Sequence, residues 1–171
     1  MRIVLLGYMG SGKTTVGKTL ATDVDIDFID LDDYIENSEG LSVAEIFASK
    51  GEIYFRKKEG EYLKMILSDK DNFVLSTGGG TPCYGDNMNA ILEGTANVFY
   101  LKVSIKELTE RLLKEKEHRP LIKNIADTDL PDFIGKHLFE RTLFYERAHH
   151  NVYCDNKTSE KITNEIKKLL V

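Results

Sequence analysis

The sequence predicts an α/β fold in which helices cover a parallel β-sheet. Short apolar runs that are typical of buried strands alternate along the chain with longer segments of helical character. The first run, residues 3–6, leads directly into a glycine-rich loop at residues 7–14, and a helical segment over residues 13–21 follows. Strand, glycine loop and helix in this succession are the expected beginning of such a fold.

Five apolar runs account for the expected strands. They are rich in the aliphatic, β-branched and aromatic residues that strands favour. The run at residues 28–29 is the weakest, because it is too short to be assigned from its periodicity alone. The expected strands are residues 3–6, 28–29, 73–76, 98–101 and 152–154.

Helix boundaries are marked by capping residues. Ser42 with Glu45, and Ser104 with Glu107, have the spacing of a capping box, in which each side chain bonds the backbone N–H of the other residue. Gly51 suits a helix end, since glycine adopts the left-handed conformation that commonly follows a helix.

Composition limits the class of protein. The chain has 171 residues, which fits one domain over residues 1–171, and its net charge of −5 comes without a basic cluster that would suggest a nucleic-acid partner. Cys83 and Cys154 are too few for a disulfide framework, and no apolar run is long enough to span a bilayer. We expect a cytoplasmic monomer without nucleic-acid or membrane partners.

One segment lacks a clear pattern. Charged residues, the sequence His118-Arg119-Pro120 and a further proline occur between Glu115 and Asp132. Long irregular segments inside a small domain are usually lids over a site or disordered loops. We expect residues 115–131 to form a mobile lid.

Residues 7–14 read G-Y-M-G-S-G-K-T and match the phosphate-binding pattern G-x-x-x-x-G-K-[ST]. The glycines let backbone N–H groups face phosphate oxygens, and the N-terminus of the following helix adds partial positive charge. Lys13 reaches the β- and γ-phosphates, and the Thr14 hydroxyl can coordinate Mg²⁺. The expected nucleotide-binding residues are Gly10, Ser11, Gly12, Lys13, Thr14 and Thr15.

A GTPase is a weaker interpretation of this loop. Residues 156–159 begin like a guanine-reading N-K-x-D segment but lack its aspartate. Residues 132–135 have the form D-x-x-G, yet they come too late in the chain and lie within a helical pattern. Both matches are expected to be accidental.

Five motifs after the loop resemble those of shikimate kinases, in the family's order and close to its spacing. The motifs are spread over most of the chain, and five of them in order identify a family more specifically than any one of them does. The motifs are F-I-D-L-D at residues 28–32, G-E-I-Y-F-R at 51–56, G-G-G at 78–80, R-P-L at 119–121 and R-T-L-F-Y at 141–145.

The resemblance implies a three-layer α/β/α fold with strand order 2-3-1-4-5, as in nucleoside monophosphate kinases. It also implies an ATP-dependent kinase that uses Mg²⁺ and transfers the γ-phosphate of ATP to the 3-hydroxyl of shikimate. Asp30 would hold Mg²⁺ opposite Thr14, and Asp32 would accept a hydrogen bond from the attacking hydroxyl. Lys13, Asp32 and Arg119 would be the catalytic residues. Arg119 would also bind ATP and would neutralise charge on the transferred phosphoryl group.

The resemblance also assigns an acceptor site. Arg56 and Arg141 would bind the shikimate carboxylate, because the planar guanidinium matches a carboxylate well. Gly79 and Gly80 would let backbone approach the substrate ring. The expected shikimate-binding residues are Asp32, Arg56, Gly79, Gly80 and Arg141.

Other interpretations remain open. Asp30 and Asp32 can be helix caps, and His149-His150 reads as a surface pair. The resemblance would place Phe47 and Phe55 against the apolar face of the substrate ring, but both can instead be core residues. In the family's R-x-P-L-Y motif, Leu143 and Phe144 replace proline and leucine. A gluconate kinase of the same fold is the nearest alternative function, and a non-catalytic nucleotide-binding relative is a further one.

Overall fold

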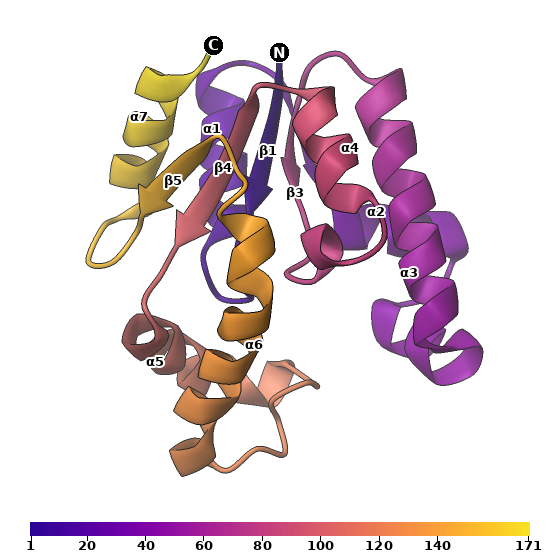
Figure 1. The fold of residues 1–171 in the computed structure, drawn as a ribbon, viewed down its shortest axis with the longest axis vertical. Coiled ribbons are helices and arrows are strands. Elements are labelled where there is room, and N and C mark those ends of the chain that lie inside the picture. Colours follow the sequence, from indigo (N-terminus) through magenta and orange to yellow (C-terminus); the bar gives the residue numbers. More distant parts are fainter.

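Five parallel strands form one sheet at the centre of the computed structural model, which describes residues 1–171 (Figure 1). The order is β2-β3-β1-β4-β5, and every neighbouring pair is parallel. This confirms the predicted topology, including the short second strand. The strands are β1 (Arg2–Leu6), β2 (Asp27–Asp30), β3 (Phe73–Ser76), β4 (Asn97–Lys102) and β5 (His150–Tyr153).

Seven α-helices connect and cover the strands. Three short 3-10 turns, Thr81–Cys83, Lys116–His118 and Asp127–Asp129, lie between them. The helices are α1 (Lys13–Asp23), α2 (Leu31–Glu39), α3 (Val43–Asp69), α4 (Asn87–Gly94), α5 (Ile105–Glu115), α6 (Leu130–Tyr145) and α7 (Ser159–Leu169). None of them is long and apolar enough to cross a membrane.

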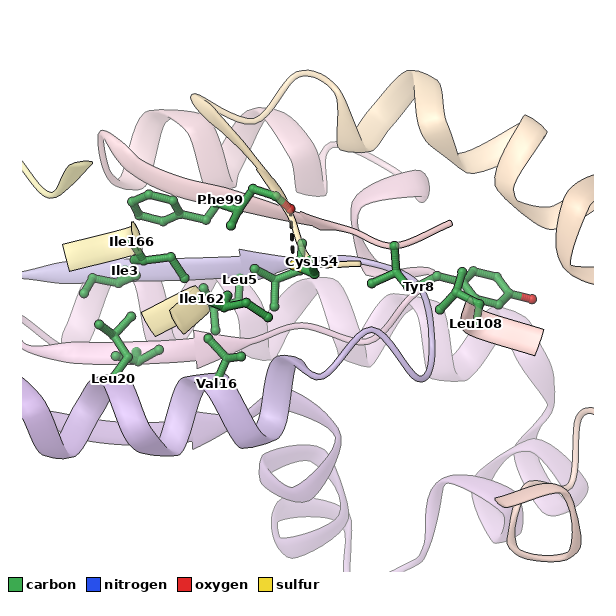
Figure 2. Close-up of a cluster of buried hydrophobic side chains, with 14 of the residues drawn as sticks. Ile3, Leu5, Tyr8, Val16, Leu20, Phe99, Leu108, Cys154, Ile162 and Ile166 are labelled. Atoms are coloured by element: carbon green, nitrogen blue, oxygen red, sulfur yellow. Dashed lines mark hydrogen bonds between the residues drawn. The ribbon is translucent and has the colours of Figure 1, made fainter. Parts of the chain in front are cut away.

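The two faces of the sheet carry two separate cores. Ile3 and Leu5 of β1 point into a cluster formed with α1, α5, α7 and the start of α6, part of which Figure 2 shows. Val4 and Leu6 point to the other face, where α2, α3, α4 and the end of α6 cover them. Because side chains alternate along a strand, the apolar residues 3–6 of β1 supply both cores. The result is the predicted three-layer arrangement.

The two predicted capping boxes differ in outcome. At the start of α3 both bonds form: Glu45 N donates to Ser42 Oγ at 3.1 Å, and Ser42 N donates to Glu45 Oε2 at 2.7 Å. At the start of α5 only Glu107 N donates to the serine hydroxyl of Ser104, at 3.2 Å. The reciprocal half of that box was wrong, because Ser104 N donates instead to Asp155 Oδ1, at 2.9 Å.

Gly51 ends one helical segment, as predicted, and another begins at once. Its φ of +85° and ψ of 171° interrupt α3, so that the helix bends between residues 50 and 52. A positive φ is inexpensive for glycine and costly for other residues. The capping box at Ser42 therefore belongs to the first segment of α3, and Arg56 belongs to the second.

The segment expected to be a lid lies beyond the carboxyl ends of the strands, together with α5 and the start of α6 (Figure 1). It has more structure than its sequence suggested. Ile122 is fully buried in the core that contains α5 and α6, and Lys116 Nζ donates to Asp127 Oδ1 at 2.6 Å. Ile122 ties the segment to the body of the protein, and the bond from Lys116 to Asp127 joins the two ends of the segment to each other.

Candidate active site

The phosphate-binding loop joins β1 to α1. Gly10 and Gly12 have φ values of +79° and +93°, and Gly12 immediately precedes the first turn of α1. A side chain would be strained at both positions. The buried Lys13 amine lies over this loop and donates to Gly7 O at 2.7 Å and to Tyr8 O at 3.0 Å. Burial lowers the pKa of Lys13 to about 8.

Asp30 joins this loop to α2. Its Oδ2 accepts from the Thr14 hydroxyl at 3.3 Å, and its Oδ1 accepts from the backbone N–H groups of Asp32 at 3.0 Å and Asp33 at 3.4 Å. Asp30 is therefore the N-cap of α2 and also faces Thr14. A hydroxyl and a carboxylate oxygen side by side suit Mg²⁺, which prefers oxygen ligands and retains waters.

Asp32 lies in the first turn of α2 and has a perturbed carboxyl group. Burial, followed by the charges of Asp30 and Glu59, raises its pKa to about 6, while the Lys13 ammonium opposes the increase. The carboxylate is thus a better proton acceptor than an exposed aspartate. Such a group next to a phosphate loop is a candidate for catalysis.

These residues share one cavity of about 370 Å³ at the carboxyl ends of β1, β2 and β3. Open α/β sheets commonly bind ligands at this edge. The predicted residues that line it come from the phosphate loop, the start of α2, the glycine triplet and the expected lid. They are Gly10, Gly12, Lys13, Thr14, Thr15, Asp30, Asp32, Gly79 and Arg119.

Four other predicted residues lie outside the cavity wall: Ser11, Arg56, Gly80 and Arg141. Ser11 is a buried residue of the loop itself. The arginines lie against the glycine triplet, because a Cβ on Gly80 would be 2.9 Å from Arg56 Nη2 and one on Gly79 would be 3.2 Å from Arg141 Nη1. The absence of a side chain at Gly79 and Gly80 therefore leaves room for both guanidinium groups next to this backbone.

Arg119 lines the cavity from the start of the segment 115–131. Its Nε donates to Glu115 Oε2 at 2.7 Å, one helical turn earlier. Glu115 also lines the cavity, so it places a negative charge where phosphate would bind. In this conformation the two side chains neutralise each other.

Comparison with known proteins gives a consistent result. The sequence profile of shikimate kinases matches residues 9–171. A shikimate kinase of Flavobacterium psychrophilum is 44% identical over 169 residues, covering 99% of this chain and 98% of that protein. The chain belongs to the shikimate kinase family.

Solved structures of shikimate kinases agree with this assignment. The enzyme from Bacteroides thetaiotaomicron has a TM-score of 0.92 at 37% identity, covering 99% of this chain and 97% of that one. The enzyme from Acinetobacter baumannii, solved in complex with shikimate, has a TM-score of 0.88 at 29% identity, covering 98% and 91%.

Two departures from the family's motifs cause no local disruption. Leu143, which stands where the resemblance led us to expect proline, is exposed on α6, and the helix continues regularly to Tyr145. Phe144 packs against the core that lies between the sheet and helices α3 and α4. Arg141 therefore projects from an ordinary helix, with its guanidinium carbon 5.6 Å from the centre of the Tyr8 ring.

The two phenylalanines differ in burial, and the two histidines differ in their contacts. Phe55 is a core residue and Phe47 is exposed, with their ring centres 4.7 Å apart. His150 stacks on Phe99 at 4.9 Å between ring centres, while His149 is exposed. The structure contains no cluster of three or more histidine, cysteine or acidic side chains arranged to hold a metal ion.

Glu59, which binds Arg56, was not among the predicted site residues. Arg56 Nη1 donates to Glu59 Oε1 at 2.7 Å, and Thr81 Oγ1 donates to Glu59 Oε2 at 2.8 Å. Glu59 is almost fully buried. The spacing of three residues on a helix was a usable signal for the first contact, but nothing in the sequence indicated Thr81.

Arg111 on α5 was also missed. Its Nη1 donates to Gly10 O at 3.1 Å, and its Nη2 pairs with Glu107, whose second oxygen accepts from Asn156 N at 3.0 Å. This arginine links the phosphate loop to the loop after β5. In the sequence it is one of several charges on an amphipathic helix.

Proposed function

We propose that this chain transfers the γ-phosphoryl group of ATP to the 3-hydroxyl of shikimate, giving shikimate 3-phosphate and ADP. One observation carries the proposal: Lys13 and Thr14 of a phosphate-binding loop share a cavity with Asp32, a carboxyl group of raised pKa. Such a cavity can hold a phosphate chain on one side and a hydroxyl acceptor on the other. Membership of the shikimate kinase family supports the choice of acceptor.

The nucleotide side consists of residues 10–15, with Arg119 facing them across the cavity. Backbone N–H groups of the loop and the N-terminus of α1 would bind the phosphate oxygens. Thr14 and Asp30 would hold Mg²⁺, and the ion would neutralise charge on the β- and γ-phosphates. Lys13 would leave the carbonyl groups of Gly7 and Tyr8 for those phosphates.

The acceptor side consists of Asp32, the glycine loop after β3 and the two arginines behind it. Arg56 and Arg141 would bind the shikimate carboxylate, and Gly79 and Gly80 would admit the ring to the backbone. A relative solved in complex with shikimate supports this acceptor. The substrate carboxylate would provide a negative partner for Arg141, which forms no ion pair within the chain, and a second partner for Arg56 beside Glu59.

The reaction needs few groups, because phosphoryl transfer passes through a loose transition state in which positioning and charge neutralisation dominate. The 3-hydroxyl oxygen forms a bond to the γ-phosphorus as the bond from that phosphorus to the β–γ bridging oxygen breaks. Asp32 accepts the hydroxyl proton. Lys13 and Arg119 stabilise the negative charge on the transferred group.

We further propose that residues 115–131 are a lid within a single domain. Arg119 would exchange its contact with Glu115 for the phosphate charge when the lid closes, and closure would exclude water from the γ-phosphate. All of the side chains proposed to bind the substrates come from one chain, so we expect a monomer to be active. We expect it to act in the cytoplasm.

The proposal is tested by measuring ADP release from ATP with shikimate, gluconate, AMP or no acceptor. Rapid release only with shikimate, and a product with the mass of shikimate 3-phosphate, are expected. Faster release with gluconate would identify gluconate, and not shikimate, as the acceptor. Equal release in all four reactions would reveal an ATPase without an acceptor site.

A further inference from the structure

Tyr84, which no family motif includes, lies against the face of the Arg56 guanidinium. The guanidinium carbon is 3.9 Å from the centre of the Tyr84 ring, compared with 5.2 Å from the centre of the Phe55 ring. Arginine stacks favourably on aromatic faces, because the ring presents negative charge to the cation. The Tyr84 contact is the closest cation–ring approach in the chain.

The other contacts of this guanidinium leave its plane poorly determined. Only Nη1 forms a short ion pair within the chain, to Glu59 at 2.7 Å, while Nε is buried without a hydrogen-bond partner. The nearest carboxylate to Nε, that of Glu52, is 3.9 Å away. A bond at one nitrogen fixes a position but permits rotation about that contact. An aromatic ring packed on the face of the guanidinium restricts that rotation and so fixes the guanidinium plane.

Tyr84 is itself held by the loop that leads from the glycine triplet. Cys83 N donates to Gly80 O at 2.9 Å, and Asn87 N donates to Tyr84 O at 3.2 Å. The same loop supplies Thr81, which bonds Glu59. One short turn therefore fixes both the carboxylate at the edge of Arg56 and the ring on its face.

A core role does not account for this tyrosine. Its side chain is 37% exposed, and its hydroxyl meets only the exposed Glu52 carboxylate, at 3.3 Å. Because the Tyr84 ring reaches the surface, its removal leaves no enclosed cavity and should cost less stability than the removal of a core ring. The contact with Arg56 is the feature left to explain.

We infer that Tyr84 is a positioning residue for the acceptor carboxylate, acting through the plane of the Arg56 guanidinium. The inference rests on the proposed function, in which Arg56 binds that carboxylate. A carboxylate accepts two parallel N–H bonds only when it is coplanar with the guanidinium. Tyr84 would therefore lower the KM for shikimate and leave phosphoryl transfer itself unchanged.

Steady-state kinetics of Tyr84→Leu and Tyr84→Phe test this inference. Leucine removes the aromatic face, so the KM for shikimate should rise about tenfold, the size of a favourable cation–ring contact. The kcat and the KM for ATP should stay within about twofold of the wild type. Phenylalanine keeps the ring and should restore a KM close to that of the wild type.

Tyr54→Leu is a matched control. It removes another ring that faces a cation, Lys50 Nζ at 4.6 Å from the ring centre, on the same helix as Arg56. Its KM for shikimate should not change. A rise in KM equal to that of Tyr84→Leu would show that α3 responds to any such loss, and it would overturn the inference.

A double-mutant cycle identifies the route of the effect. In an Arg56→Ala background, Tyr84→Leu should leave kcat/KM for shikimate unchanged within about twofold. A persistent tenfold loss, or a Tyr84→Phe variant as impaired as Tyr84→Leu, would overturn the inference while the proposed function stands. A wild-type enzyme that does not phosphorylate shikimate would overturn both.

Discussion

Thr14 and Asp30 are in contact across the phosphate-binding loop, with the threonine hydroxyl donating to Asp30 Oδ2 at 3.3 Å. The other oxygen of the same carboxylate caps α2. A structural role and a metal-binding role for Asp30 are therefore compatible, because each uses a different oxygen. Because only one Asp30 oxygen faces the expected metal site, the roles of Asp30 and Asp32 can be distinguished by experiment.

Asparagine substitutions of the two aspartates should fail in different ways. Asn caps helices as well as Asp does, so Asp30→Asn should fold normally and lose only charge beside Thr14. Higher Mg²⁺ should recover part of its activity. Asp32→Asn should lower kcat by about 10²–10⁴ at any Mg²⁺ concentration, as expected for loss of a positioned acid–base group.

The measurement is a Mg²⁺ titration of both variants at saturating ATP and shikimate. MgATP affinity should be nearly unchanged in Asp32→Asn. Equal recovery of the two variants, or recovery of Asp32→Asn alone, would contradict the assignment of Asp30 to the metal and Asp32 to the acceptor.

Arg119→Ala should lower kcat far more than it weakens shikimate binding. Arg119 faces the phosphate loop rather than Arg56 or Arg141, so its charge is needed where negative charge develops during transfer. We expect a fall in kcat of about 10² or more. Separate measurement of kcat and of the shikimate Kd is the check, and a normal kcat with weakened shikimate binding would place Arg119 in the acceptor site.

Glu115→Gln is the companion to that variant. It removes the charge that pairs with Arg119, and the pair is partly exposed, so stability should change by less than about 1 kcal/mol. If Glu115 competes with phosphate for Arg119, the KM for ATP should fall. A higher KM for ATP would indicate that the glutamate assists nucleotide binding.

The methyl ester of shikimate tests the arginine pair. Loss of a charge-assisted contact in a desolvated site costs a few kcal/mol, so kcat/KM for the ester should be about a hundredfold lower than for the acid. Comparison of the two substrates with the same enzyme preparation gives the ratio directly. An ester that reacts nearly as well as the acid would remove Arg56 and Arg141 from the acceptor site.

The sequence predicted well what depends on local patterns. Strand positions followed from apolar runs such as residues 73–76, and the phosphate loop followed from its glycines and Lys13. The strand order came from the family resemblance, since periodicity does not encode which strands are neighbours. Contacts made through folding, such as Thr81 with Glu59 and Arg111 with Gly10, could not be predicted, because each joins residues far apart in the chain.

The same limit explains the incorrect half of the second capping box. The spacing of Ser104 and Glu107 is that of a reciprocal pair, and the first turn does use the serine. However, Asp155 from the loop after β5 takes the backbone N–H of Ser104, and Glu107 turns to Arg111. A long-range partner displaced a local one.

Activity should depend on pH through Asp32 and Lys13. The pKa of Asp32 is raised to about 6, so the carboxylate form is lost as pH falls through that value, and kcat/KM for shikimate should fall with it. The pKa of Lys13 is lowered to about 8, so its positive charge is lost as pH rises through that value, and kcat/KM for MgATP should fall. Initial rates measured across this range are the check. Profiles that are flat from about pH 5 to 9 would contradict both assignments.

The raised pKa of Asp32 also has a consequence for stability. Burial and the charges of Asp30 and Glu59 disfavour the ionised carboxyl, so the folded state binds the Asp32 proton more tightly than the unfolded state does. Stability conferred by this group is therefore present below its ordinary pKa of 3.8 and is lost as pH rises towards about 6. An uncharged asparagine of similar shape should avoid that loss.

Asp32→Asn should consequently unfold at higher urea concentration than the wild type at pH 7, although it is the variant with the greatest loss of activity. The expected gain is about 1–3 kcal/mol in the free energy of unfolding, from a pKa shift of about two units. The difference between the two proteins should shrink as pH falls, and it should nearly vanish below the ordinary aspartate pKa. Urea titrations at several pH values measure it. A variant that is less stable than the wild type at pH 7, with a gap independent of pH, would show that the Asp32 carboxylate is a structural group and not a strained functional one.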